Sequence, residues 1–150
     1  MAIIKSSKSI VILLTIAAFT LIASTYAAIS VNQSVNSIGT ISTSPNMGVY
    51  SDSACTNAIT TLNWGSIAAG GTTTQTVYLK NSGTGSMALN MTTSAWSPGV
   101  ASTYLALNWN KEGIVLSAGQ STAATLTLTV SSSTTGITSF SNTITFFGTG

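Results

Sequence analysis

The sequence has 150 residues, enough for one domain, and it is 44% hydrophobic but only 4% charged, with no histidine. Nucleic-acid binding needs several cations to neutralise phosphates, and only four basic residues are present, two of them (Lys5 and Lys8) at the extreme N-terminus. Without histidine, neither a Ser-His nor a Cys-His catalytic pair can form. We therefore expect a protein that is not an enzyme, binds no nucleic acid and carries no cofactor.

Residues 1–27 have the three-part pattern of a secretory signal peptide. A short basic segment with Lys5 and Lys8 precedes an apolar run over residues 10–23, and small residues precede a predicted cut after Ala27. A membrane-spanning helix needs about 20 consecutive apolar residues, so a retained span is the weaker interpretation. A pilin-type leader, cut before the apolar run, is the alternative. The pattern predicts a secreted protein with no membrane segment after cleavage.

Residues 28–45 form a predicted N-terminal extension that is rich in Ser and Asn and has no charge. Ile29, Val31 and Val35 alternate with polar residues and share one face of an extended chain. We expect Ile38 and Ile41 to break this alternation, which becomes poor past Val35. The extension is expected to be either one extended strand or a tail.

Residues 46–150 carry short alternating segments with turn signals about every ten residues, which is typical of an all-β domain. The segments expected to be strands are residues 58–64, 73–80, 87–93, 105–109, 114–116, 124–130 and 140–147, with a loop over residues 95–102. Strands with one apolar face and one Ser/Thr face pack as two antiparallel sheets. We expect an immunoglobulin-like β-sandwich, with a jelly roll as the alternative.

Few side chains beyond the leader could carry chemistry. Asp52 and Glu112 lie in different predicted turns, so a catalytic carboxylate pair is not expected. Cys55 is the only cysteine and cannot form a zinc site alone. It is either a small buried hydrophobe or the partner in an intermolecular disulfide.

Two segments match the acceptor pattern for N-glycosylation, at Asn32 and Asn90. Such matches arise by chance in a chain rich in Ser, Thr and Asn, but Asn90 also lies on the polar face of its predicted strand. Tyr50, Tyr78 and Tyr104 are packing residues or, alternatively, a platform on which sugars stack.

Several segments, read in order, carry a family resemblance. They are residues 49–55 (VYSDSAC), 62–67 (LNWGSI), 77–83 (VYLKNSG), 107–109 (LNW), 116–120 (LSAGQ) and 140–148. Together they resemble small archaeal surface proteins of the bundling-pilus and thread-filament type, which are similar to the bacterial camelysin/TasA biofilm fibre subunits. The resemblance covers most of the chain from Val49 onward.

This resemblance implies an exported sandwich that polymerises by donor-strand exchange, with residues 28–41 completing a sheet in the next copy. The donor side chains that it implies are Ile29, Val31, Val35, Ile38 and Ile41. The expected product is an extracellular, cell-surface homopolymer, assembled head-to-tail, that serves adhesion or biofilm cohesion and could carry glycans. The alternative is a surface adhesin or carbohydrate-binding sandwich that does not polymerise.

Overall fold

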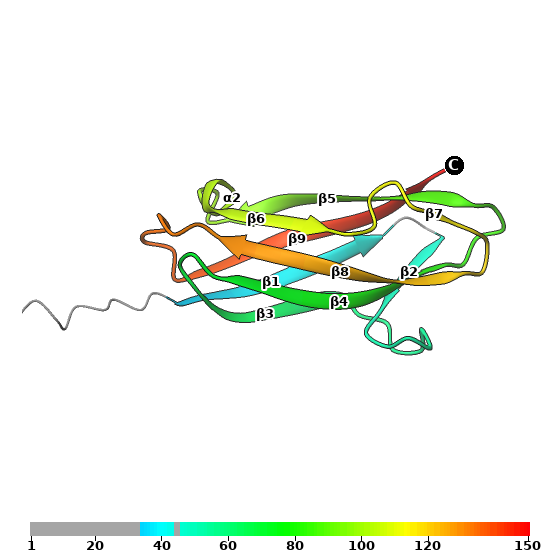
Figure 1. Ribbon diagram of the computed structural model, residues 1–150, viewed down its shortest axis with the longest axis horizontal. Helices are drawn as coiled ribbons and strands as arrows, with labels where there is room; N and C mark the ends of the chain where they lie inside the picture. The colour runs from blue at the N-terminus through cyan, green and yellow to red at the C-terminus, as the bar shows by residue number, and fades with distance from the viewer. Residues whose placement is uncertain (1–33, 44–45) are drawn as a thin grey trace, which may run out of the picture. The chain divides into compact units, whose positions relative to one another are not determined.

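The computed structural model describes residues 34–43 and 46–150, which form two β-sheets (Figure 1). One sheet has five strands in the order β3-β1-β9-β5-β7, and the other has four in the order β2-β4-β8-β6. The elements are β1 (Ser34–Thr43), β2 (Met47–Tyr50), β3 (Thr61–Ala68), β4 (Thr72–Asn81), β5 (Met87–Ser97), α2 (Ala101–Tyr104), β6 (Leu105–Trp109), β7 (Val115–Leu116), β8 (Ser121–Val130) and β9 (Ser139–Thr149). The prediction of an all-β fold with two sheets is confirmed.

The core lies between the two sheets and follows the alternation of the sequence. On β8, Leu126 and Leu128 are buried, while Thr127 between them lies on the outer face. On β9, Ile144 and Phe146 are completely buried. β-branched and aromatic residues suit such half-buried strands, and each inward row contributes to one continuous apolar cluster.

The end of β5 differs from the expected loop over residues 95–102. The strand continues to Ser97 across an irregularity in its pairing with β9, and Ala95 adopts a positive φ of 50° there. The Trp96 ring stacks on Phe140 with 5.8 Å between ring centroids. This contact holds the end of β5 on the sandwich before the chain turns into the short helix α2.

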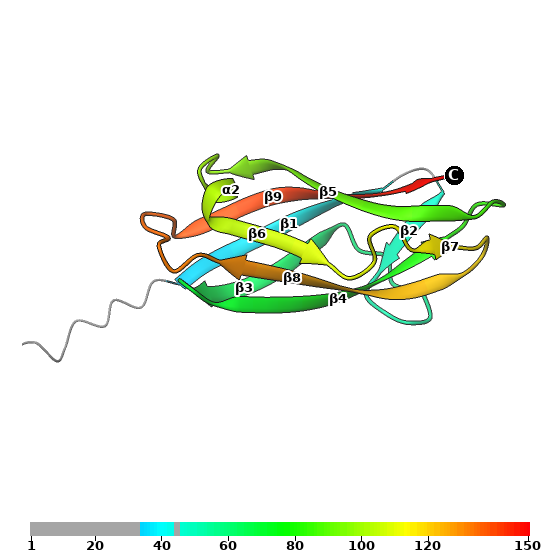
Figure 2. The same ribbon diagram turned by 45° about the horizontal axis from the view of Figure 1, so that its top comes forward.

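Part of the predicted N-terminal extension is a strand of the sandwich. Ser34–Thr43 forms β1, which is antiparallel to β3 and parallel to β9 in the same chain. Both ribbon views place it between these two strands (Figures 1 and 2). Among the described strands, β1–β9 is the only parallel pair, so the expectation of two wholly antiparallel sheets was wrong for this pair. The predicted signal peptide lies outside the described residues.

The connection after β4 depends on a buried asparagine. The Asn81 side chain donates to the carbonyl oxygens of Gly85 (2.8 Å) and Leu116 (3.0 Å) and accepts from the Gly83 N–H (2.9 Å). Since Asn81 is completely buried, these bonds satisfy the polar atoms of its own side chain, which water does not reach.

Replacing this side chain should therefore destabilise the fold. We expect Asn81→Ala to lower the free energy of unfolding by about 2–4 kcal/mol, because the buried Leu116 carbonyl loses its donor and the turn at Gly83 and Gly85 loses two further hydrogen bonds. Asn108→Ala, on the exposed face of β6, is the matched control and should change it by less than about 0.5 kcal/mol. Urea unfolding followed by tryptophan fluorescence measures both, and equal effects would contradict the role of Asn81.

Candidate functional site: the groove filled by β1

The groove between β3 and β9 receives one row of side chains from β1. These inward residues alternate along the strand: Val35, Ser37, Gly39 and Ile41. Val35 is fully buried and Ile41 nearly so, whereas Ser37 and Gly39 contribute almost no apolar surface between them. The middle of the strand is therefore a weak filler of the core.

The groove is shallow beneath Gly39. This residue pairs with Leu62 on β3 and with Asn142 on β9. A Cβ atom on Gly39 would lie 3.1 Å from Cδ1 of Ile144, 3.4 Å from Nε1 of Trp64 and 3.6 Å from Oδ1 of Asn142. The space at this level is slightly too small for a methyl group unless the end of the Ile144 side chain moves, and two of the three atoms that line it are polar.

These polar atoms belong to a set without hydrogen-bond partners. Within the described residues, the buried side-chain atoms that lack a partner are Oγ of Ser37, Nε1 of Trp64, and Oδ1 and Nδ2 of Asn142. They come from β1 and from its two neighbours, β3 and β9. Burying a polar group without a partner costs about 1–3 kcal/mol. The contact between β1 and its own groove is thus poorly matched in polarity.

The predicted donor residues separate into three groups. Val35 and Ile41 point into the core, while Ile38 lies on the outer face and is 57% exposed. Ile29 and Val31 lie outside the described residues. Val35 and Ile41 share one parity, so the expectation that Ile41 breaks the alternation was wrong. The same parity marks Ser37 and Gly39 as inward, which we did not predict as site residues.

Two of the predicted modification sites, Asn90 and Cys55, lie on other elements than those that form the groove. Asn90, on β5, is half-buried, and its Nδ2 donates to the Ala88 carbonyl (3.0 Å) and to Oγ1 of Thr149 (3.2 Å). Cys55 is a half-buried free thiol in the loop after β2. Asn32 lies outside the described residues.

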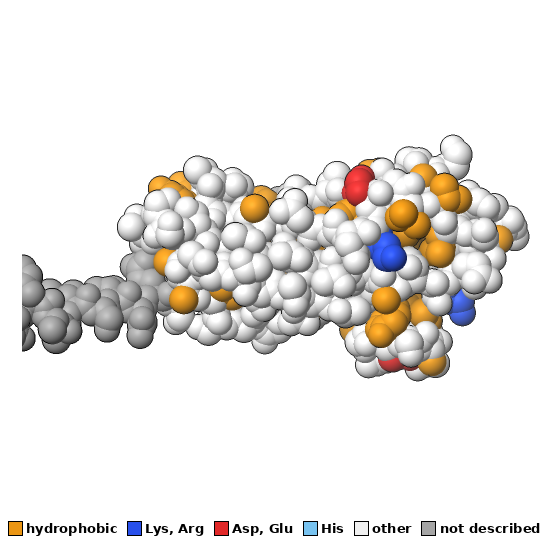
Figure 3. Space-filling view, viewed as in Figure 1, with side chains coloured by type: hydrophobic (Ala, Val, Ile, Leu, Met, Phe, Trp, Pro, Cys, Tyr) orange, Lys and Arg blue, Asp and Glu red, His pale blue; other side chains and the backbone are white. Residues whose placement is uncertain are grey.

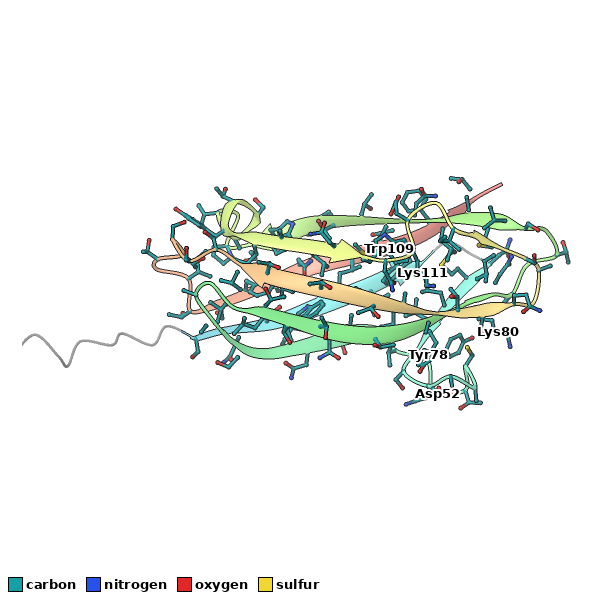
Figure 4. All side chains as sticks on the ribbon, in the orientation of Figure 1. Asp52, Tyr78, Lys80, Trp109 and Lys111 are labelled. Atoms are coloured by element: carbon teal, nitrogen blue, oxygen red, sulfur yellow. The ribbon has the colours of Figure 1, made fainter. Side chains whose placement is uncertain are left out.

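Two of the three tyrosines considered for sugar stacking are brought together. Tyr50 on β2 and Tyr78 on β4 are direct cross-strand partners, whereas Tyr104 ends α2. Figure 4 shows Tyr78 and Lys80 on β4, with Asp52 on the loop that follows β2. The face in view carries few charged side chains, and these gather with hydrophobic ones near β2 and β7 (Figure 3).

The two acidic residues of the sequence each stabilise a separate loop. Asp52 accepts from the N–H groups of Asn57 (2.7 Å) and Thr56 (3.1 Å), and Glu112 accepts from Nε1 of Trp109 (2.6 Å). Among the described residues there is no group of three His, Cys, Asp or Glu side chains that could hold a metal ion. In the same part of the chain, no helix has the length and apolar character needed to cross a membrane.

A scan against models of known protein families and a search of curated proteins both found no match for this chain. The groove and the strand that fills it are the features with the clearest functional meaning, since they combine a chain segment of unusual direction with buried polar atoms that have no partners.

The hydrogen bonds to Asp52 predict a specific effect of pH. The Asn57 N–H, followed by the Thr56 N–H, lowers the pKa of Asp52 below its ordinary value. A lowered folded-state pKa stabilises the fold at pH values above the unfolded-state pKa, and this contribution is lost as the pH falls through the folded-state pKa. We expect a shallow fall in melting temperature below about pH 4 that Asp52→Asn reduces. Thermal melts between pH 7 and pH 2 test this, and identical acid slopes in both proteins would contradict it.

Proposed function

We propose that this chain is the subunit of an extracellular, cell-surface filament in which β1 of one copy fills the groove of the next. The observation that carries the proposal is β1 itself. It comes from the N-terminal extension, forms the one parallel pair among the described strands and leaves buried polar atoms without partners. A strand with these properties is a candidate for exchange between copies.

Strand order supports an immunoglobulin-like sandwich over a jelly roll. In immunoglobulin domains, one sheet holds strands A, B, E and D and the other holds C, F and G. The order β2-β4-β8-β6 matches A-B-E-D, and the pairing of β5 with β9 matches that of C with F. The place beside β9, which strand G takes in such domains, is occupied by β1. The first strand of the sandwich, β1, thus occupies the position that the last strand, G, has in immunoglobulin domains.

The connection between β1 and β2 supports exchange. Only residues 44–46 separate the two strands, and short connections favour an exchange of strands between copies. A groove that accepts its own β1 presents the same backbone groups and core contacts to the β1 of another copy. Because donor strand and groove are different surfaces of one subunit, repeated exchange that does not close into a ring gives a head-to-tail fibre.

The remaining features fit an exported surface filament. The leader pattern supports secretion, and the family resemblance supports a role in adhesion or biofilm cohesion. Asn32 and Asn90 are acceptor sites for glycans in that setting, and Cys55 is half-buried rather than buried, so a disulfide between copies remains chemically accessible.

Electron microscopy of the purified mature protein tests the filament directly. We expect long unbranched fibres, and a chain lacking residues 28–43 should form none, because its groove has no donor. A synthetic peptide of residues 34–43 should bind the shortened chain and raise its melting temperature, since it restores the missing strand.

Two substitutions in the peptide test whether the inward side chains of β1, rather than its outer face, cause the binding. Val35→Asp in the peptide should abolish binding, because it places a charge in the core, whereas Ile38→Asp on the outer face should leave binding nearly unchanged. A mature protein that remains a monomer under all conditions, with its own β1 in place, would refute the proposed function.

A carbohydrate-binding adhesin is the second candidate, favoured by the Tyr50–Tyr78 pair. Deleting the extension removes a strand of the sandwich in either kind of protein, so loss of function on deletion does not separate the two candidates and point variants are used instead. If the adhesin function holds, Tyr78→Ala should weaken binding to neutral polysaccharides about tenfold or more, because the sugar loses an aromatic face. Tyr104→Ala is the control, and glycan-array binding is the measurement. Equal binding by wild type and Tyr78→Ala would exclude this site.

A further inference from the structure

We infer that β1 of the neighbouring copy enters the groove antiparallel to β9, reversed relative to the chain's own β1. In this direction Ser37 of the donor occupies the level of Gly39 and hydrogen-bonds to Trp64 and Asn142 of the recipient. The inference rests on the proposed function and deepens it, because it assigns the direction and register of the exchanged strand. Ser37 becomes the residue that determines them.

The inward side chains of β1 are compatible with both directions. Their order is aliphatic, small, small, aliphatic, from Val35 through Ser37 and Gly39 to Ile41. Read backwards, the order of sizes is the same. Reversing the strand about the centre of this row puts Val35 where Ile41 was and Ile41 where Val35 was, so each of these two positions changes by one methylene. It also puts Ser37 where Gly39 was and Gly39 where Ser37 was. Changes of this size are ones that a core tolerates.

The chain's own direction leaves the polar groups of the groove unmatched. Ser37 and Asn142 are each 2% exposed and Trp64 is 4% exposed. Bulk water therefore cannot hydrogen-bond to these side chains in place of the missing protein partners. The Ser37 hydroxyl lies at a level where the described chain offers it no partner, while the Trp64 indole and the Asn142 amide flank a glycine. The Ser37 hydroxyl therefore lies one inward residue away, along β1, from the Trp64 and Asn142 groups that could hydrogen-bond to it.

Reversal corrects this mismatch in one step. Gly39 then occupies the level where the hydroxyl had no partner, and Ser37 occupies the level of Gly39. A Cβ at that level lies 3.4 Å from Nε1 of Trp64 and 3.6 Å from Oδ1 of Asn142. An Oγ atom on this Cβ can accept the indole N–H and donate to the amide oxygen, since a hydroxyl does both.

The steric requirement of the reversed strand is small. The nearest atom to the new Cβ is Cδ1 of Ile144 at 3.1 Å, the far end of a side chain that can move by a few tenths of an ångström. The backbone does not decide the direction, because reversal makes the pairing with β9 antiparallel and the pairing with β3 parallel. The polar side chains therefore decide it.

Filament and monomer should respond to the same substitutions in opposite ways. Ser37→Ala should leave monomer stability unchanged or raise it, because the hydroxyl has no partner there, and should raise the critical concentration for polymerisation about tenfold. The double variant Ser37→Gly with Gly39→Ser exchanges the two residues. It should stabilise the monomer and weaken the filament, because the hydroxyl now meets Trp64 and Asn142 in the chain's own direction.

The control is Thr40→Ala, which removes a hydroxyl from the exposed outer face of the same strand. It should change neither the critical concentration nor the midpoint of urea unfolding appreciably. If Ser37→Ala destabilises the monomer as much as it weakens the filament, or leaves the critical concentration unchanged, Ser37 does not determine the direction and the inference is overturned.

A cryo-electron microscopy map of the wild-type filament gives the direction independently of any variant. A donor strand antiparallel to β9, with Ser37 beside Trp64, is the expected result. A donor strand parallel to β9 would overturn this inference and leave the proposed function standing. If no filaments form under any condition, the proposed function and this inference both fail.

Discussion

The structure depends on a strand lying between β3 and β9. Neither of these strands pairs with the other, so without β1 each would present a row of unpaired backbone groups beside an open core. Ile144 on β9 is completely buried, and its Cδ1 lies 3.1 Å from the Cβ position of Gly39, so removing β1 would uncover this side chain. The sandwich therefore needs an occupant in this groove, but the groove does not by itself require that the occupant come from the same chain.

The polar surface is consistent with repeated contact between copies. Beyond residue 27 the chain carries only four charged residues, Asp52, Lys80, Lys111 and Glu112, so close approach of two copies meets little repulsion. The outer face of the four-stranded sheet carries cross-strand threonines instead, and Oγ1 of Thr72 lies 3.3 Å from Oγ1 of Thr129. Hydroxyl groups both donate and accept, which makes such a face compatible with another like itself.

The alternation of the sequence was sufficient to predict much of the fold. Apolar residues at every second position gave the inward faces of β4, β8 and β9, including Asn142 in the same row as Ile144. The continuation of β5 to Ser97 was missed, because it depends on Trp96 meeting Phe140 from a distant strand. Local pattern carries no information about such contacts.

The partners of β1 were not predictable for the same reason. Its inward row contains only two aliphatic residues, Val35 and Ile41, with Ser37 and Gly39 between them, so the period of two is weak. Ile38 looked like a core residue by type, yet it falls on the opposite parity and is exposed. The buried polar atoms without partners could not be predicted at all, since they arise only when three separate strands meet.

The poor match between β1 and its own groove has a consequence under the proposed function. A subunit must remain soluble until it meets a neighbour, and a groove filled by its own strand prevents premature association. If that filling were ideal, the strand would not leave. Buried polar groups without partners each cost about 1–3 kcal/mol, so they lower the stability of the monomer in which β1 occupies its own groove, but they do not expel the strand. Under the proposed function, serine at 37 and glycine at 39, rather than the reverse, would make the monomer exchangeable and leave the better-matched contact to the filament.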